Sequence, residues 1–105
     1  MPSFPKRCLI MGCIIGTLKF ILQIPNCNSL KAKRSIIKRL TARIKKRFNV
    51  AVAEIDLQDV KDRASLAAVS VSSDISYLNG QLDLILNFID REHSFVLENH
   101  QIEFY

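Results

Sequence analysis

The sequence contains few of the residues that bend, break or cross-link small proteins. It has three glycines, three prolines and no tryptophan in 105 residues, which excludes collagen-like chains, low-complexity chains and glycine-rich phosphate loops. Its three cysteines, Cys8, Cys13 and Cys27, form no Cys-x-x-Cys pair and have no histidine at ligand spacing. They therefore support neither a disulfide framework nor a zinc site. We expect a reduced, cytoplasmic setting, with no metal ion or other cofactor.

A long uninterrupted hydrophobic run is also missing. The apolar stretch over residues 8–15 contains Cys13, and only five residues separate Arg7 from that cysteine. This is too short for the hydrophobic core of a secretion signal, which needs about seven residues or more. Lys19 then interrupts the apolar stretch, whereas a membrane-spanning helix needs about 20 apolar residues. We interpret this segment as a strand and expect no membrane partner. Residues 1–10 are expected to be a disordered extension or an incorrectly assigned start, and residues 11–105 a single domain.

Acidic residues are absent from the first half of the chain. Residues 1–48 hold twelve lysines and arginines and no acid, whereas residues 49–105 hold three basic and ten acidic residues. The formal net charge of +5 therefore conceals one basic and one acidic half. This asymmetry favours a basic surface that meets an anion such as phosphate. The alternative is that the opposite charges merely keep different helices soluble.

Hydrophobic periodicity predicts six elements in the order βαββαβ. The predicted strands cover residues 14–24, 50–55, 64–72 and 95–104, with an interruption near 99–100; the predicted helices cover residues 29–48, capped by Asn28 or Ser29, and 74–91, capped by Ser72 or Ser73. With right-handed crossovers this order gives an α+β, ferredoxin-like domain, a four-stranded antiparallel sheet with two helices on one face. The second helix is expected to bury Ile75, Leu78, Leu82, Ile85, Leu86 and Ile89.

The helix predicted over residues 29–48 contains nine cations and no acid. At about 100° per residue, its cations form two exposed rows, which are Lys31, Lys38 and Lys45 in one and Arg39, Arg43 and Lys46 in the other. Cations in the first turns oppose the helix dipole at roughly 0.3–1 kcal/mol each, and a bound anion would offset that cost. The candidate anion-binding or RNA-binding residues are Ser29, Lys31, Lys33, Arg34, Lys38, Arg39, Lys45 and Lys46. The alternative is an ordinary surface helix in which Lys33 pairs with an acid across the fold.

The helix predicted over residues 74–91 is apolar on two sides. Tyr77, Leu84 and Phe88 lie roughly opposite its expected core side, and we predict that they form a partner interface. Packing against the core of the same chain is the alternative. The sheet face away from the helices, which carries Ile15 and Ile21, is a further surface on which a second copy could pack. Both features favour a homodimer.

No complete catalytic motif is present, and we expect that the protein is not an enzyme. His93 and His100 have no serine or cysteine in a nucleophile motif, which indicates surface residues. The spacing of Asp56, Asp59 and Asp62 lacks the glycine and terminal glutamate of a calcium loop. Readout of RNA bases is also disfavoured, because the central strands expose no aromatic residues and a Gly-x-x-Gly loop is absent.

Segments 24–35 and 47–54, with the shorter matches 58–59, 63–64 and 71–74, resemble the YlxP-like family of small bacterial proteins. The resemblance covers roughly residues 11–105. It implies a ferredoxin-like fold, a domain of unknown function, and genes that often lie beside those for translation initiation and ribosome maturation.

The residues characteristic of the family coincide with the start of the basic helix. By position they are Ser29, Leu30, Lys31, Lys33 and Arg34. Two positions depart from the family pattern, since Lys61 stands where an aromatic residue is usual and Leu57 where a histidine is frequent.

The sequence therefore predicts a non-catalytic cytoplasmic protein. We expect it to bind structured RNA or ribosomal particles through phosphate contacts of the basic helix, as a homodimer and without readout of DNA sequence. The alternative is a protein-interaction or regulatory homodimeric module that binds no nucleic acid.

Overall fold

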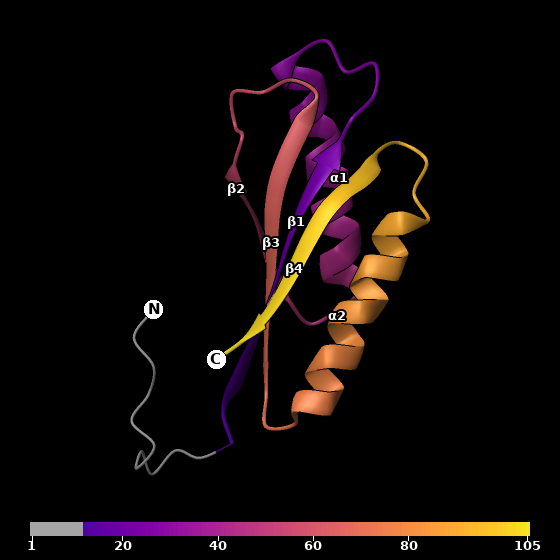
Figure 1. Ribbon diagram of the computed structural model, residues 1–105. Coiled ribbons are helices and arrows are strands. Elements are labelled where there is room, and N and C mark those ends of the chain that lie inside the picture. Colours follow the sequence, from indigo (N-terminus) through magenta and orange to yellow (C-terminus); the bar gives the residue numbers. More distant parts are fainter. Residues whose placement is uncertain (1–11) are drawn as a thin grey trace.

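The computed structural model describes residues 12–105, so the expectation for residues 1–10 lies outside the described part of the chain (Figure 1). The elements are β1 (Ile14–Gln23), α1 (Leu30–Arg47), β2 (Ala51–Asp56), β3 (Arg63–Ser72), α2 (Ile75–Asp90) and β4 (Val96–Phe104). The strands form one antiparallel sheet in the order β2-β3-β1-β4, and both helices cover the same face (Figure 1). The predicted ferredoxin-like α+β fold is confirmed.

Strand β1 lies in the middle of the sheet and separates its two faces. Leu18, Phe20 and Leu22 point to the helices and are fully buried, whereas Lys19, between them, is exposed on the other side. We call the uncovered side the outer sheet face. This arrangement follows from the alternation of apolar and polar residues, because successive side chains of a strand point to opposite faces.

Helix α1 begins where the sequence predicts it. Ser29 is the N-cap, and its hydroxyl accepts a hydrogen bond from the Ala32 amide at 3.0 Å. The helix packs on the sheet through Ile37, Leu40 and Ile44, which are buried in the core. The opposite side of α1 faces solvent along its whole length.

Helix α2 differs from the prediction at its start. Its N-cap is Asp74, not Ser72 or Ser73, and the Asp74 carboxylate accepts from the amides of Ser76 and Tyr77 at 2.9 and 3.3 Å. A carboxylate suits this position because it also meets the positive end of the helix dipole. The Ser72 hydroxyl instead accepts from the Asp74 amide at 3.1 Å.

Ile75 is also exposed rather than buried as predicted. It is the first residue of α2, and the buried side of the helix begins one turn later, at Leu78. Gln81 occupies a buried position instead, and the Ser70 hydroxyl lies 3.4 Å from its side-chain oxygen. The interruption predicted near residues 99–100 is a register shift of β4 against β1, opposite Ile21 and Leu22.

Candidate functional site

The solvent-facing side of α1 carries a continuous set of cations. We call this set the α1 basic face, and its members, all exposed, are Lys31, Arg34, Lys38, Arg39, Lys45 and Lys46. None of them forms an ion pair with any of residues 12–105. The first turn of the helix has no acidic residue. The positive charge of this face is therefore not neutralised within the described part of the chain.

Lys33 is the member of the predicted site that does not belong to this face. It is completely buried, and its Nζ lies 3.0 Å from Glu54 Oε2. The same nitrogen donates to the carbonyl oxygens of Leu57 at 2.8 Å, Arg63 at 3.2 Å and Gln58 at 3.4 Å. Its assignment as an anion-binding residue is wrong, and the alternative, in which it pairs with an acid across the fold, is correct.

The position of Lys33 in the helix explains its burial. Residues 33, 37, 40 and 44 share one side of α1, so Lys33 extends from the core side. A charged group in such a place is retained only when it is paired and hydrogen-bonded. The Glu54 carboxylate and three carbonyl oxygens supply those partners.

Two of the four partners of Lys33, Leu57 and Gln58, lie in the loop between β2 and β3, residues 57–62, and the other two, Glu54 and Arg63, lie in the strands beside it. Leu57 adopts a left-handed conformation with φ of 60°, which costs a bulky residue of order 1–2 kcal/mol. Its amide donates to Asp56 Oδ1 at 2.8 Å, and its carbonyl accepts from the Val60 amide at 3.0 Å as well as from Lys33. Lys33 thus ties the start of α1 to this loop. The spacing of residues in the sequence gives no signal for partners that are backbone carbonyl oxygens. Glu54 does give a signal, because it is an acid on the inner side of a strand of valines and alanines.

The remaining predicted residues divide between surface and interior. Ser29 is used as the helix cap. Tyr77 and Leu84 are exposed at 60% and 58%, as a partner surface requires. Phe88 is half-buried and makes an edge contact with Phe48, with 6.2 Å between the ring centroids. Its assignment to the partner surface needs correction, because its ring packs within the chain.

Arginines of α1 cover the Phe88 ring. The guanidinium carbons of Arg43 and Arg47 lie 5.2 and 5.0 Å from its centroid, within the range of a cation–π contact. Arg43 also forms an ion pair with Glu92. These two arginines hold α1 and α2 together and are not part of the α1 basic face.

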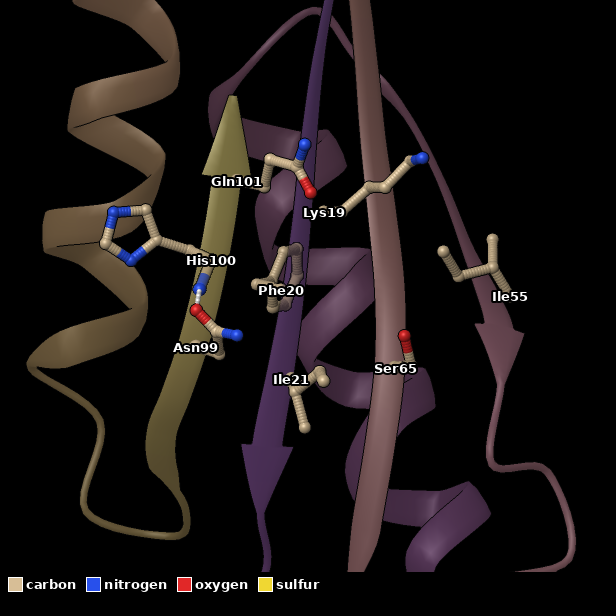
Figure 2. A pocket seen from close by; sticks show the side chains of 8 residues that line it. All are labelled: Lys19, Phe20, Ile21, Ile55, Ser65, Asn99, His100 and Gln101. Carbon is tan, nitrogen blue, oxygen red and sulfur yellow. Dashed lines mark hydrogen bonds between the residues drawn. The ribbon is translucent and has the colours of Figure 1, made fainter. Parts of the chain in front are cut away.

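The outer sheet face contains a shallow hollow across β1, β2, β3 and β4. Its lining residues are Lys19, Phe20, Ile21, Ile55, Ser65, Asn99, His100 and Gln101. Figure 2 shows Lys19, Ile21 and Gln101 from neighbouring strands, with His100 pointing away from them. Within residues 12–105, no three His, Cys, Asp or Glu side chains are placed to hold a metal ion, and no helix is long and apolar enough to cross a membrane.

Tyr105, on the same face, has an ionisation shifted by its neighbour. Its hydroxyl donates to Glu103 Oε2 at 3.0 Å, which raises the pKa of Tyr105 above its ordinary 10.0. Because the folded chain favours the neutral phenol, this stabilisation is present at neutral pH and is lost as the pH rises through the raised pKa. In a Tyr77→Phe background, we expect Glu103→Gln to lower the pKa of Tyr105 towards 10.0, measured by the ultraviolet absorbance of the phenolate. An unchanged pKa would show that the hydrogen bond is absent in solution.

Comparison with known proteins identifies relatives of this chain. A family described as "Protein of unknown function (DUF503)" matches residues 15–102. The uncharacterized protein YlxP of Bacillus subtilis (strain 168) is 39% identical over 77 residues, which cover 73% of this chain and 84% of that protein. The predicted resemblance to the YlxP-like family is confirmed.

Two solved structures resemble this chain at low sequence identity. Protein SO0527 from Shewanella oneidensis is 14% identical, covers 89% of this chain and 88% of its own, and gives a TM-score of 0.49. SnoaB, a cofactor-independent oxygenase from Streptomyces nogalater, is 12% identical, with coverages of 90% and 91% and a TM-score of 0.43. Likeness at this level extends to the fold alone.

Proposed function

Since the chain belongs to the DUF503 family of proteins of unknown function, we propose a function from its own surface: it binds structured RNA, free or in ribosomal particles, through the α1 basic face. The single observation that carries this proposal is the set of six exposed cations without an ion pair to residues 12–105. The protein acts by binding and not by catalysis. The proposal places it in the cytoplasm, where a reduced setting suits the free thiols of Cys13 and Cys27.

The geometry of α1 suits the backbone of a nucleic acid. Its 18 residues span about 27 Å at 1.5 Å per residue, long enough for several phosphates. Each phosphate contact releases counterions, so such binding is strong at low salt and weak at high salt. No aromatic residue lies among these cations, which favours backbone contacts over base readout.

Four acids form ion pairs within residues 12–105, and all four pair with cations outside this face. Glu103 lies 3.7 Å from Lys19, and Glu98 accepts both guanidinium hydrogen bonds of Arg63, at 2.9 and 3.0 Å. Glu54 and Glu92 are engaged by Lys33 and Arg43. An anionic ligand is a direct physical reason why the cations of the α1 basic face stay unpaired while other cations of the chain are paired with acids.

The proposal is tested by removing one row of the face. We expect the triple variant Lys31→Gln, Lys38→Gln, Lys45→Gln to bind a fluorescent RNA hairpin about 10- to 100-fold more weakly at low salt. The slope of log K against log salt concentration should become shallower by about 2–3. Fluorescence anisotropy titrations at several salt concentrations, and co-sedimentation with ribosomes at two, measure both effects.

A charge-matched control separates the face from net charge. The variant Lys6→Gln, Lys61→Gln, Arg91→Gln removes the same number of cations outside α1 and should keep more than half of the affinity. Equal losses of affinity in both variants would show that net charge, and not the α1 basic face, determines RNA binding. Unchanged affinity in the α1 variant would reject the proposal.

A second candidate is a protein-interaction module that uses α2. Tyr77 and Leu84 are exposed and border a hollow with Phe48 and Arg47. Leu84→Asp distinguishes the two functions, because it leaves RNA binding intact under the first and abolishes association with a partner under the second.

A further inference from the structure

The outer sheet face is an apolar surface that no element of the fold covers. Both helices lie on the other side of the sheet (Figure 1). Among residues 12–105, most of the large apolar side chains that remain exposed lie on this face, and they are Ile55, Val69, Val71, Val96 and Tyr105. By strand register, Val69, Val71 and Tyr105 lie together at one end of the face, and Ile55 and Val96 lie towards the other end. A monomeric soluble protein seldom gathers so many exposed apolar side chains on one face.

The rest of this face carries small side chains and little net charge. Small residues fill its middle, where Ala67 pairs with Ala53, and flank Val69, which pairs with Ala51 and Thr17. Its charged residues occur as opposite pairs, Lys19 with Glu103 in the middle and Arg63 with Glu98 near one end. The face therefore differs in kind from the α1 basic face and is unsuited to a polyanion.

We propose that a second copy of this chain packs against the outer sheet face, sheet against sheet, in a two-fold symmetric dimer. In such an interface the same patch meets itself, so it must be complementary to its own shape and charge. The small residues of the face, Ala51, Ala53 and Ala67, allow a second sheet to approach closely. The face also carries Lys19 and Glu103 side by side. A two-fold rotation can therefore place Lys19 of each copy opposite Glu103 of the other copy.

The size of the face fits a stable dimer. The four strands have ten, six, ten and nine residues, and at about 3.3 Å per residue and 4.8 Å between strands they cover roughly 550 Å² per copy. Two copies together bury about 1,100 Å², which is near the lower limit of specific interfaces. The dimer does not depend on RNA binding, and it leaves both α1 basic faces open on opposite outer sides.

Sedimentation equilibrium of the full chain tests the dimer. We expect the wild type to have twice the chain mass of 12.0 kDa. Val69→Glu, on this face, should have the mass of one chain and retain the far-ultraviolet circular dichroism of the wild type. Leu84→Glu is the matched control, an exposed apolar residue of α2, and should remain dimeric. A dimer that persists in Val69→Glu, or that is lost only in Leu84→Glu, overturns the proposal.

A charge exchange on the same face gives a second test that leaves the apolar residues in place. Lys19→Glu should raise the dissociation constant about tenfold or more, because it brings like charges together at the interface. Adding Glu103→Lys restores opposite charges and should return the constant to within about threefold of the wild type. Wild-type protein that is monomeric at about 100 µM, or a double variant no tighter than Lys19→Glu alone, contradicts the dimer. Mass is the readout here, so failure of RNA binding cannot be mistaken for failure of the dimer.

Discussion

Replacing Lys33 with methionine is expected to lower the free energy of unfolding by about 3–4 kcal/mol at neutral pH. The substitution keeps most of the buried aliphatic stem but removes the ammonium group. Glu54, whose side chain is only 20% exposed, is then left as an unpaired charge. The carbonyl oxygens of Leu57, Gln58 and Arg63 lose their common donor at the same time, and each hydrogen bond lost without replacement adds to the cost.

Urea denaturation of the variant measures this loss, and Lys38→Met is its control. Lys38 lies on the same helix, one and a half turns later, but is exposed and unpaired within residues 12–105. Its replacement should change stability by less than about 0.5 kcal/mol. If Lys33→Met were equally mild, the buried ion pair would be absent in solution. Glu54→Gln should cost less than Lys33→Met, because it keeps a hydrogen-bond acceptor beside the ammonium group.

The buried role of Lys33 also determines how binding must be tested. A variant that lacks Lys33 would lose RNA binding simply because less of it is folded. Lys31, Lys38 and Lys45 avoid this difficulty, since all three are exposed. A loss of affinity in their triple variant therefore reports on the surface and not on the fold.

The fold was predictable because two periodicities repeat over long segments. In β1, Leu18, Phe20 and Leu22 recur at every second residue and all three are buried, whereas the residues between them include Lys19, which is exposed. In α1, Ile37 and Ile44 recur at helical spacing and lie in the core. Such patterns depend on the geometry of single elements, which the sequence determines locally.

The site was harder to predict because its partners are distant in sequence. Residue type alone places Lys33 with the surface cations, although its position in α1 lies on the same side of the helix as Ile37. The carbonyl groups that bind Lys33 lie 24–30 residues away, in a loop and at the start of the strand that follows it, and no spacing rule gives the conformation of that loop. Phe88 was misassigned for a similar reason, since Arg43 and Arg47, which cover its ring, come from the other helix.

Truncation of Phe20 should show how strongly the two faces of β1 differ. Phe20 is 1% exposed, in the core between the sheet and the helices, so Phe20→Ala is expected to cost about 3–5 kcal/mol through lost burial and the cavity left behind. Ile21, the next residue, points to the outer sheet face and is only half-buried. Ile21→Ala should therefore cost about 1 kcal/mol.

Both substitutions are best compared in the Val69→Glu background, where the proposed dimer contributes nothing to stability. Thermal unfolding followed by circular dichroism gives the two losses, and similar values for Phe20→Ala and Ile21→Ala would mean that β1 does not present one face to the helices. In the wild-type background the cost of Ile21→Ala should increase with protein concentration, because Ile21 is then buried against the second copy. The cost of Phe20→Ala should not, because the Phe20 ring contacts the same core in monomer and dimer.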